Sequence, residues 1–334
     1  MRCITMRTLA LTALAGLGAA ACGSSGSSGP SGATFSAAAA QGGAAIAQSL
    51  GADALSTFTY GSYDASNLPS FTAAAPHAKG ALAGALYEMG VRGRALGAVA
   101  GAPILYRSSD ACVPTLSGDI SADTPIDTDG DGVPDSVVAT FTAGNCTVVD
   151  SADGFTIAYA GTIKIVDIGD LFGFRLVVDF VYTFSTASST ETVHEVGTDT
   201  YTEAAQLADV NVNLADTTRT TGAGASTVLL DEAMEFQFIP SSGSLVFGDP
   251  LPDGHFTIVG GIGISIPGQP NSFSFDIATP TPLAYSAACN SDGDDPVFTA
   301  GHITGGFHGT ITAGFDVTFT GCNVQPTVTT FGTS

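Results

Sequence analysis

The sequence is poor in positive charge and contains no tryptophan. Nine lysines and arginines stand against 31 aspartates and glutamates, which gives a formal net charge of −22. Because such a chain repels polyanions, we expect nucleic acid and anionic lipid head groups to be poor partners, and we predict no nucleic-acid partner. The lack of tryptophan argues against a sugar-binding module, since such modules stack sugars on large aromatic faces. Apolar residues make up 44% of the chain and charged residues only 12%, so a folded core is expected.

Catalytic signatures are also lacking. The sequence has no G-x-S-x-G, H-E-x-x-H, Walker or dinucleotide-binding motif. His302 and His308 have the same strand parity, but a zinc site needs a third ligand that the sequence does not identify. We therefore expect both histidines to face solvent or to be hydrogen-bonded. No carboxylate pair stands out for glycoside hydrolysis, so the sequence predicts no enzyme.

The most informative motif is an acidic loop at residues 127–135, which reads DTDGDGVPD. Calcium in a loop of this kind takes oxygen ligands from positions 1, 3, 5, 7 and 9, the seventh through its backbone carbonyl. These positions hold Asp127, Asp129, Asp131, Val133 and Asp135. Gly132 occupies position 6, where the chain turns sharply. Four carboxylates at this spacing repel one another unless a cation lies between them, so we predict bound Ca²⁺.

Over these nine residues the loop resembles the calcium loops of thrombospondin type 3 repeats and, more distantly, those of dockerins and EF-hands. The resemblance implies bound calcium and no particular fold. Val138 stands where an EF-hand has its bidentate Glu. We therefore expect weak binding, with a Kd on the order of 10⁻⁴–10⁻³ M, unless Asp119 or Asp123 completes the shell. The alternative is an acidic turn whose Asp side chains only cap backbone N–H groups.

The N-terminus predicts export. Residues 8–21 form a short, uncharged, Ala/Leu-rich run that is typical of a signal-peptide core. The run ends in Ala-Ala-Ala-Cys22, which resembles the lipobox of bacterial lipoproteins. The resemblance implies removal of residues 1–21, lipidation of Cys22 and, with Gly23 next, sorting to the outer membrane. Residues 22–34 would then be a flexible Gly/Ser tether. Simple secretion is the alternative, because the alanines also satisfy the ordinary cleavage rule.

The cysteine count favours the lipoprotein. Cys3 is lost with the signal, and lipid on Cys22 leaves four cysteines, an even number that suits two disulfides. We predict the pairs Cys112–Cys146 and Cys289–Cys322, which would staple two related units, although four cysteines allow three pairings. Chance similarity between the two regions is equally open. The acidic loop at residues 290–295 lacks the glycine at position 6 and is not predicted to bind metal.

The hydrophobic pattern changes near residue 107. Residues 35–106 are rich in Ala and Gly, and the helical spacing of Leu82, Leu86 and Met89 predicts an amphipathic helix over 78–91 that covers the main domain. From residue 107 to 334 the period is two. Strands are predicted at 157–165, 174–184, 228–238, 256–266, 273–277 and 311–319. Such a series predicts a mainly β fold, an antiparallel β-sandwich or barrel-like sheet with a short helical N-terminal segment.

These features predict a cell-envelope lipoprotein, anchored by lipid in the outer membrane, with a calcium-stabilised all-β domain. We expect a structural role, or binding of a protein or small molecule that the sequence does not identify. One alternative is a secreted or surface hydrolase with an unrecognised carboxylate site. Another is an integral outer-membrane barrel, which the predicted helices, the disulfides and the polar C-terminus disfavour.

Overall fold

The computed structural model describes residues 115–121, 124–131, 133–143, 146–150, 155–169, 172–222, 226–246, 251–268, 272–289, 298–308, 312–322 and 324–333. This part of the chain contains β-strands and no α-helix, which confirms the prediction of a mainly antiparallel β protein. The predicted signal peptide, tether and helix at 78–91 lie outside the described residues.

The strands follow one another along the chain with short connections. Their bounds are β1 Thr115–Gly118, β2 Ile120–Ser121, β3 Thr124–Pro125, β4 Ser136–Phe141, β5 Thr147–Asp150, β6 Phe155–Asp167, β7 Gly173–Thr186, β8 Ser189–Ala204, β9 Leu207–Gly222, β10 Ser226–Pro240, β11 Gly254–Ser265, β12 Ser272–Tyr285, β13 Phe298–His308, β14 Thr312–Phe319 and β15 Thr327–Thr333. β2 and β3 form a separate two-stranded ribbon.

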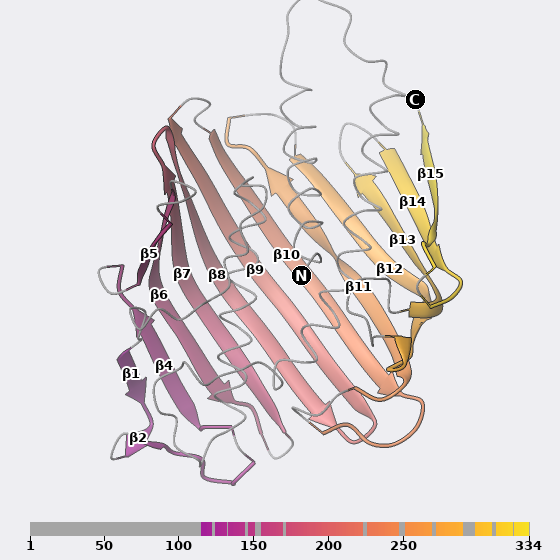
Figure 1. Cartoon of the computed structure of the whole chain (residues 1–334), viewed down its shortest axis with the longest axis horizontal. Helices are drawn as coiled ribbons and strands as arrows, with labels where there is room; N and C mark the ends of the chain where they lie inside the picture. Colours follow the sequence, from indigo (N-terminus) through magenta and orange to yellow (C-terminus); the bar gives the residue numbers. More distant parts are fainter. Residues whose placement is uncertain are drawn as a thin grey trace, which may run out of the picture.

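All the other strands belong to one 13-stranded antiparallel sheet (Figure 1). Its order is β1-β4-β6 and then every strand in sequence order to β15, with β5 paired to β6. From β6 onward each strand therefore pairs with the next one along the chain. These 13 strands form one sheet with edges at β1 and β15, and the expected sandwich or barrel closure is not confirmed.

Alternation of side chains gives the sheet one buried face. In β7, Phe174, Leu176, Val178 and Phe180 are buried, whereas the residues between them are exposed. The six predicted strands correspond to β6, β7, β10, β11, β12 and β14. Because successive side chains of a strand point to opposite faces, this pattern commits one whole face of the sheet to the core.

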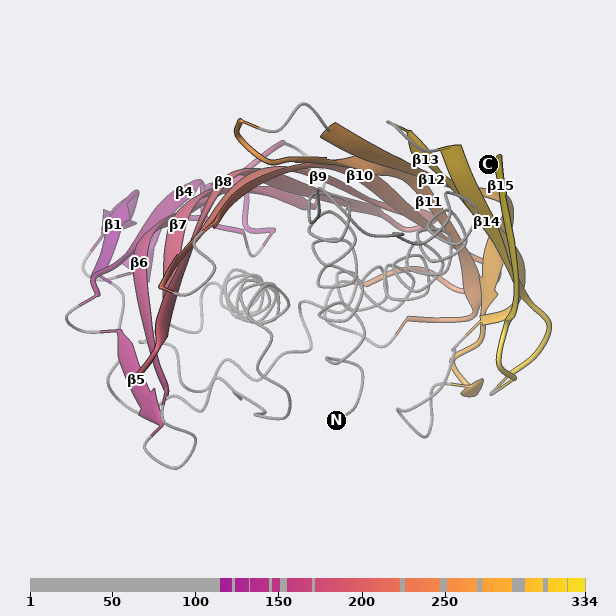
Figure 2. The same ribbon diagram turned by 90° about the horizontal axis from the view of Figure 1, so that it is seen from above.

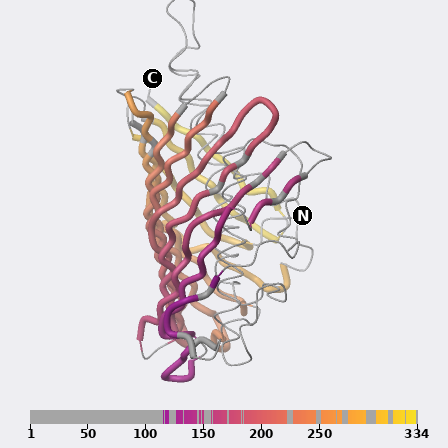
Figure 3. The backbone as a smooth tube through the Cα atoms, turned by 90° about the vertical axis from the view of Figure 1, so that its left-hand side faces the viewer, coloured from indigo at the N-terminus to yellow at the C-terminus, as the bar shows by residue number. Residues whose placement is uncertain are grey.

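The buried face is the concave one. The sheet is strongly curved, as the view from above and the side view show (Figures 2 and 3). Strands two apart in a sheet are separated by about 9–10 Å. Rings from such strands nevertheless meet, with centroids 5.2 Å apart for Phe141 and Phe180 and 5.5 Å apart for Phe275 and Phe315. Convergence of side chains is expected on the inside of a bend, which agrees with the curvature in the figures.

Gly161 of β6 allows the first of these contacts. It lies between Phe141 of β4 and Phe180 of β7 in the two ladders, so the rings meet across a residue that has no side chain. Its φ of +126° is a conformation that favours glycine. A Cβ at this position would lie 2.2 Å from the carbonyl oxygen of Asp179. This position of β6 therefore requires glycine.

The concave face also carries carboxyl groups. Glu195, Asp199 and Asp216 are at most 8% exposed, and Glu191 has the same strand parity as Glu195. Burial raises the pKa of Glu191 to about 7. An acid in this environment resists ionisation, because the charged form loses its hydration.

One predicted disulfide is present in the described part. Cys289 and Cys322 are bonded, with 5.6 Å between their Cα atoms. Cys146 is also disulfide-bonded and is fully buried. Its predicted partner Cys112 lies outside the described residues. The pairing Cys112–Cys146 stays a prediction, which mass mapping of peptides from a non-reduced digest would check.

We expect Gly161→Ala to destabilise the protein by about 2–5 kcal/mol, because it adds both backbone strain and a clash. Gly263→Ala is the matched control, since a Cβ there meets nothing closer than 3.8 Å. The control should stay within about 0.5 kcal/mol of the parent. Urea unfolding measures both variants, and equal losses would show that Gly161 is not a steric requirement.

We expect Glu191→Gln to remove part of the pH dependence of stability. The folded-state pKa of about 7 exceeds the ordinary value of 4.5. The stability that goes with the neutral acid is thus present below about pH 4.5 and is lost as the pH rises through about 7. The variant should therefore have the same Tm as the parent near pH 4.5 and a higher Tm than the parent near pH 8. Asp231→Asn, on the exposed face of β10, removes the same charge and is the control.

Candidate metal centre

The acidic loop connects β3 to β4, and backbone hydrogen bonds close its base. The N–H of Asp135 donates to the carbonyl of Ile126 at 2.9 Å, and the N–H of Ile126 donates to the carbonyl of Asp119 at 2.8 Å. Val133 is 1% exposed and anchors the loop in the core. The loop is therefore tied to the sheet at its base and packed against it by its second half.

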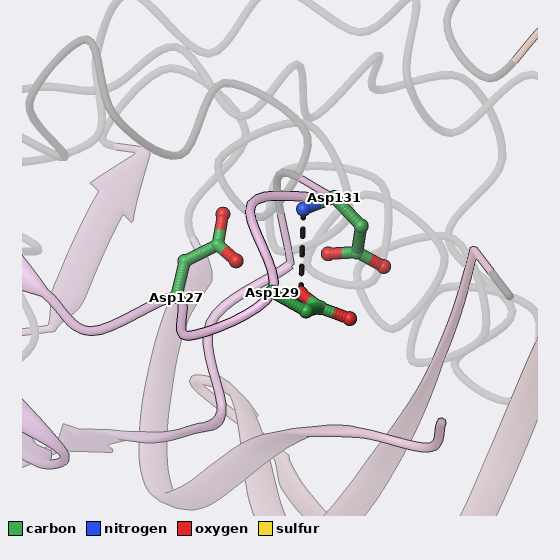
Figure 4. A group of neighbouring side chains, drawn as sticks. All are labelled: Asp127, Asp129 and Asp131. Carbon is green, nitrogen blue, oxygen red and sulfur yellow. Dashed lines mark hydrogen bonds between the residues drawn. The ribbon is translucent and has the colours of Figure 1, made fainter. Parts of the chain in front are cut away.

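Three of the predicted ligands gather on the inside of the turn. One carboxylate oxygen from each of Asp127, Asp129 and Asp131 lies within 4.8 Å of the other two (Figure 4). Among the residues that the structure describes, this is the one group of three or more acids, histidines and cysteines that comes so close. Gly130, at φ +80°, provides the turn that brings them together. Gly132 lies outside the described residues.

Backbone N–H groups occupy some of these oxygens. Gly130 donates to Oδ1 of Asp127 at 2.7 Å, and Val133 donates to Oδ1 of Asp131 at 2.7 Å. The N–H of Asp131 donates to Oδ1 of Asp129 at 3.3 Å. These are the capping bonds that a metal-free acidic turn also makes. They fix the carboxylates in place in either case, so they do not separate the two interpretations.

The environment of Oδ2 of Asp131 favours the metal site over the metal-free acidic turn. This oxygen is buried and has no hydrogen-bond partner. Burial raises the pKa of Asp131 above its usual range, and the negative charges of Asp129, Asp167 and Asp127 raise it further against the effect of the Val133 N–H. A buried acceptor without a donor costs about 1–3 kcal/mol. A hard cation would satisfy this oxygen and cancel the repulsion.

Asp135, the predicted ninth-position ligand, is held elsewhere. Its carboxylate accepts hydrogen bonds from the hydroxyl of Thr128 at 2.5 Å and from the N–H of Thr128 at 2.9 Å. These bonds hold the pKa of Asp135 below its usual value. Asp135 therefore braces the loop in this structure, whereas Asp127, Asp129 and Asp131 form the cluster. Asp123, proposed as an additional ligand, lies outside the described residues.

Asp167 was missed by the sequence reasoning. It ends β6, and its N–H donates to the carbonyl of Asp135 at 3.3 Å. Its charge contributes to the raised pKa of Asp131. The pairing of β4 with β6 brings it to the loop, with Ser136 opposite Val166. No local signal reveals such a neighbour, because it depends on strand pairing.

The two histidines behave as expected. His302 lies 3.3 Å from Oδ1 of Asp316, and His308 lies 2.9 Å from Oδ2 of Asp276. Both pairs are on the outer face and at least 32% exposed. His194 makes a similar contact with Asp179 at 2.8 Å. The same arrangement on three different strand pairs indicates surface pairing rather than a shared catalytic centre.

A shallow hollow of about 750 Å³ lies on the outer face over β8 to β12. Its floor is made by small residues, including Ala215, Ala233, Gly261 and Gly263, and acidic side chains border it. It is more apolar than polar and wide open. A hollow with this lining specifies no ligand by itself.

No protein-family model, curated protein or solved structure matches this chain. In the described residues no helix is long and apolar enough to cross a membrane.

We expect substitutions of Asp131 and Asp135 to act in opposite directions when calcium is removed. Asp131→Asn should raise the Tm in chelator, because it removes a buried and repelled charge while the amide oxygen still accepts the Val133 N–H. Asp135→Asn should lower the Tm, because the carboxylate accepts two hydrogen bonds from Thr128. Calorimetry of both variants in chelator measures the effect. If the Tm in chelator shifted in the same direction for both variants, the carboxylates of the cluster would not repel one another enough to destabilise the fold.

Proposed function

We propose that this chain is a cell-envelope lipoprotein whose all-β domain is stiffened by Ca²⁺ bound at Asp127, Asp129 and Asp131. The observation that carries the metal proposal is the approach of three carboxylates within 4.8 Å around a buried oxygen without a hydrogen-bond partner. Carboxylate oxygens suit a hard divalent cation. Calcium is favoured over magnesium, because a flexible loop tolerates its irregular coordination and magnesium demands near-octahedral geometry.

The binding we propose is weak. Three carboxylates, with the Val133 carbonyl as a further ligand, leave several of the 6–8 coordination positions to water. This places the Kd at about 10⁻⁴–10⁻³ M, the range of extracellular modules. Free calcium outside cells is high enough to fill such a site, which agrees with the export signal. The ion would lock the β3–β4 loop onto the end of β6.

The anchor is the second part of the proposal. Lipid on Cys22 would attach the protein to the outer membrane, and residues 22–34 would act as the tether. The support is the lipobox-like ending of the signal peptide and the even number of remaining cysteines. Mass analysis of the mature N-terminus tests it, and an unmodified, secreted chain would replace the anchor with simple export.

We also infer a structural or binding role rather than catalysis, with a barrel-like, strongly curved sheet as the scaffold. The support is the uniform pairing of the outer-face histidines with exposed aspartates and the lack of any catalytic signature in the sequence. The partner, a protein or a small molecule, would meet a negatively charged surface.

We expect 10 mM Ca²⁺ to stabilise the purified domain by about 1.4–2.7 kcal/mol relative to chelator. At roughly 2–4 °C per kcal/mol this raises the Tm by about 3–10 °C. Asp129→Asn with Asp131→Asn should abolish the increase. Asp292→Asn with Asp294→Asn, in the second acidic loop, removes the same charge and should leave the increase intact. Identical melting of the parent with calcium and with chelator would contradict the metal site.

A further inference from the structure

The last strand of the sheet, β15, has one edge without a neighbouring strand in the part of the chain that the structure describes. It pairs with β14 along its whole length and ends the order of the 13-stranded sheet. Figures 1 and 2 show it as the outermost strand on one side of the sheet, with β1 on the opposite side. The backbone N–H and C=O groups along such an edge can pair with a further strand.

The sequence of β15 lacks the features that usually protect an edge strand. Residues 327–333 read TVTTFGT, with no charged residue and no proline. The ladder with β14 also runs without a register shift. Natural edge strands are usually blunted by charged side chains, proline or bulges. Threonine, valine and phenylalanine favour extended backbone, so this strand is suited to pairing rather than protected from it.

Apolar side chains are exposed on both faces of β15. Val328, which is 40% exposed, stands opposite the buried Val317 and so lies on the concave face. Phe331, which is 56% exposed, stands opposite Gly314 on the outer face. Its ring lies over Gly314, where an added Cβ would clash with it. The glycine therefore seats one side of the ring, while more than half of Phe331 stays exposed at the edge.

Charge indicates the kind of partner. No charged side chain occurs from residue 317 to residue 334, in a protein with 31 acidic and nine basic residues. The one acid of β14, Asp316, lies 3.3 Å from His302 of β13, on the side of β14 away from β15. Two strongly acidic molecules meet with least repulsion at an uncharged surface. The other edge differs, because β1 is followed by Asp119 and the acidic loop.

We propose that β15 pairs with β15 of a second copy of this chain, in antiparallel orientation about a two-fold axis at Thr330. Thr330 is the middle residue of the seven-residue strand, so pairing about it uses the whole strand. Thr329 then stands opposite Phe331 of the partner subunit, and aromatic and β-branched residues are favourable cross-strand neighbours. Val328 stands opposite Gly332 of the partner subunit, so no side chain opposes it. No like charges come together.

Other arrangements fit less well. Pairing of β15 with β1 of another copy would use four residues instead of seven, next to the acidic loop. Because each copy would keep a free edge, this pairing would form open chains instead of a closed dimer. A basic partner would be attracted to the acidic surface and not to the uncharged edge. The proposal is independent of the calcium site and of the lipid anchor, since neither contributes a residue to β15.

Sedimentation velocity of the purified full-length protein at about 1–200 µM tests the pairing. We expect a reversible monomer–dimer equilibrium, because a single strand pair is a small interface. The dimer should become tighter as NaCl is raised from about 0.05 to about 0.5 M, because salt screens the repulsion between two acidic copies. A monomer at every concentration and salt would overturn the proposal. Open-ended oligomers would also overturn it and would indicate head-to-tail pairing.

Two matched substitutions test whether β15 is the interface. Val328→Glu should weaken the dimer by about tenfold or more, because it places a carboxylate on the pairing strand of each copy. Val324→Glu is the control, since Val324 is similarly exposed, at 47%, and lies outside β15. It should change the dimer Kd by no more than about threefold. Thermal melting of each variant at a concentration where the parent is monomeric verifies its fold. Equal weakening by both substitutions would overturn the assignment to β15.

Thr330→Cys tests the register. Directly opposed residues of antiparallel strands have Cα atoms about 4.5–5.5 Å apart, a distance that a disulfide can span. Mild oxidation should therefore join two copies through the introduced thiols, and mapping of a non-reduced digest should find the peptide with residue 330 bonded to its own copy. Thr327→Cys is the control, because its two thiols would lie about 20 Å apart along the strands. Failure of residue 330 to cross-link, or equal cross-linking at residue 327, would overturn the two-fold pairing.

Discussion

The fold depends on burying one face of a single, strongly curved sheet. Because side chains alternate along each strand, every residue of β6 to β14 is committed to the concave face or to the outer face. Aromatic rings from strands two apart are in contact on the concave face. Gly161 lies between two such rings, and a side chain at this position of the middle strand would clash with neighbouring backbone. The glycine-rich composition is thus part of the core's construction.

The geometry of the candidate metal centre depends on this sheet. The acidic loop connects β3 to β4, and its base is fixed by the pairing of β4 with β6 and by the buried Val133. The sheet therefore brings Asp167, which is distant in sequence, to a cluster of acids that are close in sequence. A cation at this point would join the ribbon of β2 and β3 to an edge of the sheet, where hydrophobic burial is least effective.

The sequence predicted those strands that have a continuous apolar face, such as β7 and β14. It did not predict β8 and β9, because their buried positions include Glu195, Asp199 and Asp216, which interrupt the apolar alternation. The missed strands are therefore where the fold departs from simple hydrophobic patterning. In the loop, spacing alone predicted the approach of Asp127, Asp129 and Asp131, because their geometry is local. The position of Asp135 depended on a hydrogen bond to Thr128 that spacing does not reveal.

In both the acidic loop and the concave face, carboxylates lie close together, but the two groups of carboxylates differ in their exposure to water. At the loop, Asp129 is exposed and Asp131 is half-buried, so a hydrated ion can enter and leave. At the concave face, Glu195 is almost fully excluded from water, and a free ion there would lose its hydration without gaining a complete set of ligands. Exposure therefore explains why an exchangeable ion suits the loop and does not suit the concave face.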